Sequence, residues 1–441
     1  MSAEALAKLL GDLKDPSLVE SWSRLAEVTA SAIRSHSPVS LSGLEAAIQD
    51  IFEDLPGAGL LLCNGLVAAA EALLAALQDP QSPVNGRPEA FSCQVPQPSS
   101  GRLRITRLEV SRRQCLEILA GGFFGLLRRD WYGSPDMPGF GFEKLWCYDC
   151  RKWGGKNFVL MAVLIYFGQV AQQSKAFMEE KIVIKRKALG QPSLGDQTFC
   201  PIVFVEDGVS IHSFDSRDYL QADFANAYLG GGVLSGGGTQ EECMFIEFPE
   251  LLTTIYLVEK MLPHEAVEID GARRYIEHNM SERHATRADQ FCRPSHTVGP
   301  PILAVALDAI SYRRKPVRYQ YAAEQIQREV QKCCAALIPD GEIPSRQFVT
   351  GLWGCGAFGG DPELKLVIQW ICCSMEASIN SMIFCPFDQR WNLIEAGLVV
   401  LMQRMTDKVQ VKTVLDLLVD PDYASASNTF KYLLRKLGEP D

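Results

Sequence analysis

The first part of the chain carries apolar residues three and four positions apart, which is the spacing of an amphipathic helix. Five runs share this pattern: residues 3–13, 18–33, 43–55, 111–129 and 157–171. A stretch rich in Pro, Ser and Gly, residues 78–102, interrupts these runs and predicts a loop or linker. We therefore expect residues 1–195 to form an all-helical accessory region.

The pattern changes after about Phe199, where short runs rich in β-branched and aromatic residues alternate with helical segments. The predicted strands are residues 201–207, 265–271, 301–310, 346–353 and 381–387. The predicted helices are residues 248–262, 322–337, 363–377, 393–405 and 411–419. Strands separated by helices predict a mostly parallel or mixed sheet covered on both faces, so we expect an α/β domain over residues 196–441.

Composition is that of an ordinary globular protein, with 47% apolar and 22% charged residues among 441. Several of the 14 cysteines lie in apolar runs, for example Cys333-Cys334 and Cys372-Cys373, which predicts buried free thiols in a reducing compartment. We recognise no secretory signal, and the apolar run 157–171 is too short to span a bilayer. We therefore expect a soluble protein of the nucleus, the cytoplasm or both, without membrane contact.

The formal net charge of −10 argues against direct binding of nucleic acid, because proteins of that class usually carry a basic excess. It does not exclude a polyanion that a pocket holds at one end. One basic run, Arg313-Arg314-Lys315 with Arg318, could contact phosphates, although a solvated loop or helix start is the simpler interpretation.

Two glycine-rich segments carry the candidate chemistry. Residues 223–242 contain two Gly triplets, followed by Gln240-Glu241-Glu242. Glycines at this density allow a backbone to approach a ligand closely. The second segment contains Gly354, Gly356 and Gly359 in a G-x-G-x-x-G arrangement, which is a weak motif by itself.

A Gly-rich turn before a helix presents unpaired N–H groups and a positive dipole end, which suits a diphosphate. A tight turn without a ligand is the alternative. The two segments together resemble the signature and the diphosphate loop of the poly(ADP-ribose) glycohydrolases, and the resemblance extends from about Gln114 to about Asp416. It implies a macrodomain-like α/β/α sandwich with a mixed sheet, joined to the helical region. The implied activity is hydrolysis of ribose–ribose bonds in poly(ADP-ribose) to release ADP-ribose.

The resemblance implies that Asp223, Glu241 and Glu242 are the catalytic acids. It also implies a set of substrate-binding residues: Ile211, His212, Asn226, Gln240, Leu352, Trp353, Gly354, Cys355, Gly356, Ala357, Phe358 and Phe387. In this set the backbone of residues 352–357 would hold the diphosphate, Phe358 would lie against a ribose, and Phe387 would stack on adenine.

Cleavage of an O-glycosidic bond passes through an oxocarbenium-like state, which requires a proton for the leaving oxygen and negative charge nearby. We assign Glu242 as the general acid and then the base, Glu241 as a hydrogen-bond acceptor for ribose, and Asp223 as the group that orients or tunes the pair. A like-charged, enclosed pair should raise the pKa of one member. The alternative without a function is a solvated Glu-Glu pair at a helix start.

The sequence departs from the family pattern at three positions. The family's loop tyrosine, which covers the ligand, aligns near Ser281. Ile211-His212-Ser213 lacks the acid that reads the adenine amine, so recognition would shift to the backbone, His212 or Asp215. Leu352 replaces an Asn of the diphosphate loop. Cys147 and Cys150 form a single Cys-x-x-Cys pair, so we expect no metal.

The expected substrates are poly(ADP-ribose) and ADP-ribosylated proteins, handled by a monomer without a cofactor. Two other hypotheses stay open at this point. One is a non-catalytic ADP-ribose-binding module. The other is a dinucleotide-dependent oxidoreductase that uses the G-x-G-x-x-G segment.

Overall fold

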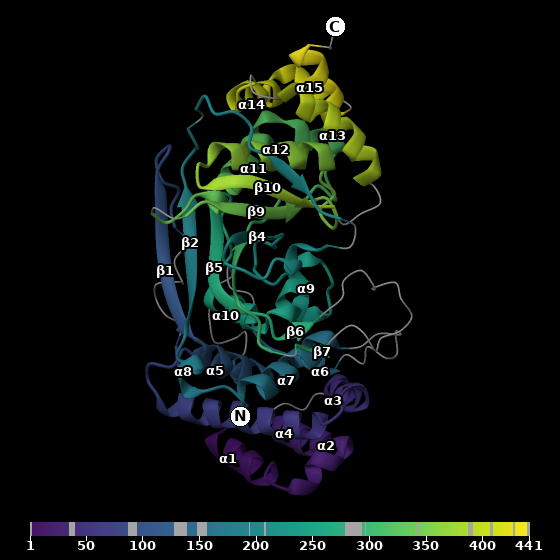
Figure 1. The fold of residues 1–441 in the computed structure, drawn as a ribbon. Coiled ribbons are helices and arrows are strands. Elements are labelled where there is room, and N and C mark those ends of the chain that lie inside the picture. Colours follow the sequence, from purple (N-terminus) through teal and green to yellow (C-terminus); the bar gives the residue numbers. More distant parts are fainter. Residues whose placement is uncertain are drawn as a thin grey trace.

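The computed structural model describes residues 2–438 except 35–39, 87–94, 128–138, 148–156, 194, 207–208, 278–292, 296, 342–343, 387–390, 406–408 and 427. Helices of the N-terminal region lie at one end of the molecule, a large sheet lies in the middle, and C-terminal helices lie at the other end (Figure 1). The N-terminal helices are α1 (Ala3–Asp12), η1 (Pro16–Glu20), α2 (Trp22–Arg34), α3 (Ser42–Asp54), α4 (Ala58–Gln78), α5 (Arg112–Phe123), α6 (Glu143–Cys147), α7 (Phe158–Val170) and α8 (Lys175–Met178).

Helix α4 forms the centre of this region. It is the one helix among the described residues that is long and apolar enough to cross a membrane by length and composition. It packs on α1, α5 and α7, and at the α7 crossing a Cβ on Gly65 would lie 2.4 Å from the backbone nitrogen of Gly168. Such a close crossing accounts for the small residues of α4 at this contact.

The central sheet has eight strands in the order β1-β2-β5-β8-β4-β9-β10-β3. In this order, neighbouring strands from β1 to β8 pair antiparallel. Neighbouring strands from β8 to β3 pair parallel. Their bounds are β1 (Leu103–Ser111), β2 (Lys181–Leu189), β3 (Ile202–Phe204), β4 (Tyr219–Asp223), β5 (Glu265–Arg273), β8 (Pro301–Ala306), β9 (Arg346–Gly351) and β10 (Ile379–Cys385). A separate antiparallel pair joins β6 (Ile276–Glu277) and β7 (Arg293–Pro294).

Helices cover both faces of the sheet. Alternate residues of β8 show this division, because Ile302 and Ala304 join the core shared with the N-terminal helices, whereas Leu303 and Val305 join the core under the C-terminal helices. The remaining helices are η5 (Ile211–Ser213), η6 (Val233–Ser235), α9 (Gln240–Glu247), η7 (Pro249–Leu252), α10 (Thr253–Leu257), η10 (Val317–Tyr321), α11 (Ala323–Leu337), α12 (Pro362–Met375), α13 (Trp391–Met405), α14 (Val411–Val419), η11 (Pro421–Ser425) and α15 (Thr429–Leu437).

This architecture confirms the predicted α/β sandwich with a mixed sheet. The expectation that residues 1–195 are all helical is wrong, because β1 and β2 lie in this range and extend the sheet through β5. The hydrophobic pattern does not reveal strand β2, because two of its buried residues are charged. These are Arg186 and Lys187, which pair with Glu265 and Glu268 on β5. The division of the chain at residue 195 stays a prediction.

A buried ion pair joins the helical region to the sheet. The guanidinium of Arg112, at the start of α5, donates to Glu250 Oε2 at 2.6 Å and to the carbonyl of Gly271 at 2.7 Å. The hydroxyl of Tyr275 donates to the same carboxylate at 2.8 Å. The side chains of Arg112 and Glu250 are 1% and 0% exposed, so neither charge can be solvated if the other is removed.

We expect Arg112→Met to lower the free energy of unfolding by about 3–5 kcal/mol, because it leaves the Glu250 carboxylate buried without its cation. Arg24→Met is the matched control, since Arg24 pairs with Asp15 on the surface, with side chains 55% and 41% exposed. That change should cost at most about 1 kcal/mol. Chemical denaturation measures both, and equal losses for the two variants would contradict the assignment.

Candidate active site

The first site element is the start of helix α9, just after the glycine triplets. Thr239 is the N-cap of α9, and its hydroxyl accepts a hydrogen bond from the backbone N–H of Glu242, whose carboxylate accepts one from the backbone N–H of Thr239. This capping box follows from the Thr-x-x-Glu spacing. It turns the Glu242 side chain back toward the loop that precedes the helix.

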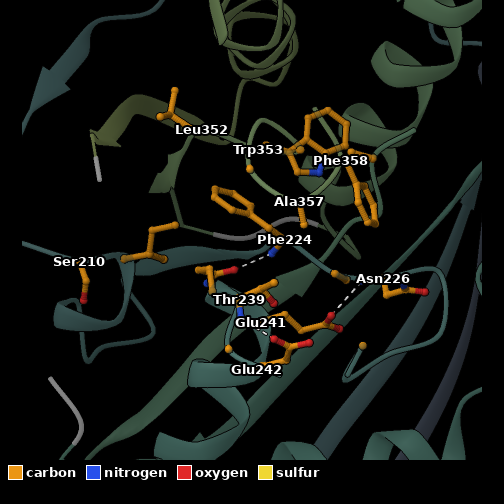
Figure 2. A pocket seen from close by; sticks show the side chains of 18 of the residues that line it. Ser210, Phe224, Asn226, Thr239, Glu241, Glu242, Leu352, Trp353, Ala357 and Phe358 are labelled. Atoms are coloured by element: carbon orange, nitrogen blue, oxygen red, sulfur yellow. Dashed lines mark hydrogen bonds between the residues drawn. The ribbon is translucent and has the colours of Figure 1, made fainter. Parts of the chain in front are cut away.

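The two adjacent glutamates bind different parts of that loop. Glu241 accepts hydrogen bonds from the backbone N–H groups of Asn226 at 3.0 Å and Gly230 at 2.6 Å. Glu242 accepts one from the N–H of Gly232 at 2.8 Å. The two adjacent carboxylates therefore diverge, as neighbouring side chains on a helix do. Figure 2 shows both side chains beside the cavity described below.

Glycine is required where these carboxylates meet the loop. A Cβ on Gly232 would lie 2.8 Å from Glu242 Oε1, and one on Gly237 would lie 2.3 Å from the same atom. Gly230 also has a φ of +82°, a conformation that L side chains rarely adopt. The first triplet therefore supplies the N–H groups of Gly230 and Gly232 to the two acids, and Gly237 in the second triplet leaves room for the Glu242 carboxylate.

The third predicted acid, Asp223, is the last residue of β4 and is 1% exposed. Neither of its carboxylate oxygens has a hydrogen-bond partner among the described residues. Burial raises the pKa of Asp223 to about 8. Burial and the nearby Asp223 carboxyl also raise the pKa of Glu241 well above its usual value, although the N–H donors of Asn226 and Gly230 act in the opposite direction. A proton on Asp223 relieves the repulsion, because Asp223 has no donor and Glu241 has two.

Gln240 is held by the protein through both ends of its carboxamide. Its Oε1 accepts from the N–H of Phe224 at 2.8 Å, and its Nε2 donates to the carbonyl of Ala222 at 3.1 Å and to His212 Nε2 at 3.0 Å. Since His212 Nε2 accepts here, its Nδ1 carries the hydrogen and donates to Glu247 Oε1 at 3.1 Å. Gln240 thus ties the end of β4 to the start of α9.

The same network continues to Asp215. Glu247 also accepts from Arg274, and Arg274 donates to Asp215 through two hydrogen bonds of 2.8 and 3.0 Å. The side chains of His212 and Asp215 are therefore occupied within the protein. Of the three expected ways to recognise adenine, the backbone of this segment is the one that remains.

The second loop runs from the end of β9 at Gly351 to Asp361, the N-cap of α12, whose carboxylate accepts from the N–H of Leu364 at 2.8 Å. Trp353 is fully buried, and its Nε1 donates to the carbonyl of Leu307 at 3.0 Å. Its role is to anchor the loop. Gly354 has a φ of +72°.

Four backbone N–H groups of this loop donate no hydrogen bond to the described part of the chain: those of Gly354, Gly356, Ala357 and Phe358. Unpaired amides in a turn ahead of a helix N-terminus form an anion-binding surface.

The two loops open into one cavity of about 430 Å³. Twelve of the predicted site residues line it: Ile211, His212, Asn226, Gln240, Glu241, Glu242, Leu352, Trp353, Gly354, Gly356, Ala357 and Phe358. Asp223 and Cys355 do not line it, and Phe387 lies outside the described residues. The sequence analysis missed Phe224, which lines the cavity directly after β4; an aromatic residue at the carboxyl end of a central strand was the available signal.

Comparisons with known proteins agree with this arrangement. Residues 193–392 match the family model of the poly(ADP-ribose) glycohydrolase catalytic domain, a macro domain fold. Poly(ADP-ribose) glycohydrolase 2 of Caenorhabditis elegans is 33% identical over 304 residues, which are 63% of this chain and 57% of that protein. Poly(ADP-ribose) glycohydrolase 1 of the same organism is 33% identical over 308 residues, 64% of this chain and 36% of that protein.

Solved structures with similar chains include two bacterial poly(ADP-ribose) glycohydrolases. The protein from Thermomonospora curvata bound to the inhibitor ADP-HPD is 17% identical, with a TM-score of 0.29, and the match covers 43% of this chain and 74% of that one. The protein from Deinococcus radiodurans in complex with ADP-ribose is 13% identical, with a TM-score of 0.31 and coverage of 43% and 78%.

The matched region spans 57% and 36% of the lengths of the two nematode relatives, so the comparison concerns a part of those proteins. Within that part, the family model covers both glycine loops and the three predicted acids. Residues 193–392 of this chain are thus similar to the catalytic domain of the poly(ADP-ribose) glycohydrolases.

Proposed function

We propose that this chain hydrolyses the ribose–ribose O-glycosidic bonds of poly(ADP-ribose) and releases ADP-ribose. One observation carries the proposal: Glu241 and Glu242 line the same cavity as four residues whose N–H groups donate no hydrogen bond to the described part of the chain, Gly354, Gly356, Ala357 and Phe358. An acid pair alone or an anion-binding turn alone has many uses. A cavity that contains both suits a substrate with a diphosphate and a glycosidic bond. The names of the relatives support the same activity.

In this proposal the diphosphate of the terminal unit binds the N–H groups of Gly354, Gly356 and Ala357, and the dipole of α12 adds to the attraction. The ring of Phe358 borders the cavity next to these groups, where it would contact a ribose. Adenine would lie toward Ile211, which is buried in a small apolar cluster. The ribose with the scissile bond would then reach the two glutamates.

Glu242 gives a proton to the leaving 2′-oxygen as the bond from the anomeric carbon to that oxygen breaks. It then accepts a proton from the water that attacks the anomeric carbon, so one water is consumed and two hydroxyls form. Glu241 accepts hydrogen bonds from ribose hydroxyls while its amide contacts hold the loop. A neutral Asp223 behind it limits the negative charge that the site must bury.

Glu242→Gln should lower the rate of ADP-ribose release by about 10²–10⁴-fold, because it removes the group that transfers the proton. Binding of ADP-ribose, measured by calorimetry, should persist, since the phosphate contacts are untouched. Glu71→Gln, on the exposed side of α4, is the matched control and should leave the rate unchanged. Retained turnover in Glu242→Gln would reject the acid–base assignment. A wild-type protein that binds ADP-ribose but releases none from polymer would instead be a non-catalytic ADP-ribose-binding module.

Gly237→Ala tests whether the glycine triplet holds the Glu242 carboxylate in place. The new Cβ would lie 2.3 Å from Glu242 Oε1, and the flexible side chain is the part that must move. We expect the turnover number to fall by about 10²-fold with a small loss of stability, because a displacement of about 1 Å is enough for such a loss. The control is Gly11→Ala, where nothing lies within 4 Å of the added Cβ. Steady-state kinetics on polymer decides; an unchanged turnover number means that the contact is not needed.

Comparing Asp223→Asn with wild type tests whether the buried Asp223 is protonated, because its protonation makes the free energy of unfolding depend on pH. Because the pKa of Asp223 is raised by burial from 3.8 to about 8, the native state binds more protons than the unfolded state in this window. Wild-type stability therefore falls as pH rises from about 4 to about 8, at up to about 1.4 kcal/mol per pH unit.

The Asn variant lacks this term, so its free energy of unfolding relative to wild type should rise across the window and level off above pH 8. Urea denaturation at several pH values measures the difference. Asp422→Asn should show the opposite sign only below about pH 3.8, because the hydrogen bond from Lys436 lowers the pKa of Asp422 from this ordinary value. Between pH 4 and 8 its difference from wild type should stay constant, which makes it a control for this window. A pH-independent difference for Asp223→Asn would contradict a protonated Asp223.

A further inference from the structure

The loop and short helix that follow β8 carry an unpaired basic cluster. It consists of Arg313, Arg314, Lys315 and Arg318, all exposed, with no acid among residues 313–318. Among the described residues, none of these four exposed cations forms an ion pair. By contrast, several buried and half-buried cations around the sheet do form ion pairs. Lys315 lies over the ring of Tyr319 at 4.6 Å from its centroid. Four like charges in so short a segment repel one another unless an anion is bound.

The basic cluster starts at the edge of the cavity. The backbone N–H of Tyr312 donates to the carbonyl of Phe358 at 2.8 Å, and Ala309, a few residues earlier, lines the cavity itself. Phe358 lies on the side of the cavity toward Asn226 (Figure 2), whose backbone N–H binds Glu241. The cluster is therefore attached to the rim of the cavity on the side of Phe358 and Asn226.

Poly(ADP-ribose) continues beyond the bond to be cleaved. When its terminal unit fills the cavity, the next unit leaves from the acid end, and each further unit carries another diphosphate. The exposed ring of Tyr319, 41% accessible, lies beside the cations and offers a flat surface for a base. A polyanion with stacked bases fits this combination better than a protein partner does.

We infer that Arg313, Arg314, Lys315 and Arg318 form a subsite for the phosphates of polymer units outside the cavity. This inference rests on the proposed function and extends it from the terminal unit to the chain behind it. The overall charge of −10 repels a polyanion, so a local positive segment at the rim orients the polymer for entry. ADP-ribose alone is too short to use this subsite.

The test compares polymer and monomer binding in full-length protein with Glu242→Gln in the background, which prevents cleavage during the measurement. One variant replaces the basic cluster: Arg313→Ala, Arg314→Ala, Lys315→Ala and Arg318→Ala. The matched control removes four exposed cations in or beside β1, α8 and β2 that form no ion pair within the described part of the chain: Arg102→Ala, Arg104→Ala, Lys175→Ala and Lys181→Ala. Labelled poly(ADP-ribose) of defined length is titrated by fluorescence polarisation at several salt concentrations, and ADP-ribose by calorimetry.

We expect the cluster variant to bind polymer about tenfold more weakly at low salt and to reduce the slope of log Kd against log salt by about 2, as lost phosphate contacts require. Its affinity for ADP-ribose should equal that of the control. Equal polymer affinity and salt slope in both variants would overturn the subsite, as would a parallel loss of ADP-ribose affinity. Single-stranded RNA that binds as tightly as polymer and loses as much affinity would show a general nucleic-acid surface instead, and would also overturn it.

The proposed function fails separately from this inference. If wild-type protein releases no ADP-ribose but the cluster variant still loses polymer affinity, the subsite stands and the hydrolase proposal falls. If release is normal and polymer affinity does not depend on the cluster, the hydrolase proposal stands and the subsite falls.

Discussion

The first turn of helix α9 determines the geometry of the site. Its two glutamates turn back and accept backbone N–H groups from the loop that precedes the helix. A loop of glycines can surround two carboxylates in this way, whereas a side chain at Gly232 or Gly237 would overlap with Glu242. The acids therefore shape the loop as much as the loop positions the acids. This mutual dependence explains why glycines and acids occur together in one short segment.

The helix start must also be fixed relative to the sheet, and a buried polar network does this. Gln240 joins β4 to His212, and Glu247 and Arg274 continue the connection to Asp215. Arg274 directly follows β5, so the network spans elements from three parts of the chain. Each member has partners at hydrogen-bond distance, which makes the network rigid. The side chains of His212 and Asp215, which the sequence offered as ligand contacts, instead support the first turn of α9.

The sequence was sufficient for the α/β class, because strand periodicity is a local signal. It was sufficient for most of the cavity lining because the two glycine segments resemble those of the poly(ADP-ribose) glycohydrolases. It was insufficient where partners are distant along the chain. Gln240 contacts groups 16 and 28 residues away, so its supporting role has no local pattern. Strand β2 was missed for a similar reason, since its buried Arg186 and Lys187 are neutralised by β5, which lies far along the chain. Asp223 was found as an acid, but its exclusion from the cavity depends on packing.

The proposed binding mode has an electrostatic reason for its orientation. The N–H groups of Gly354, Gly356, Ala357 and Phe358 would attract a diphosphate, whereas the carboxylates of Glu241 and Glu242 would repel it. An ADP-ribose unit would therefore place its phosphates on the later loop and its sugar at the acids. Burial raises the pKa of Asp223 to about 8, and a proton on this carboxyl lowers the negative charge next to Glu241. A buried carboxyl without a hydrogen-bond partner among the described residues would in this way adjust the charge of the proposed site to a dianionic ligand.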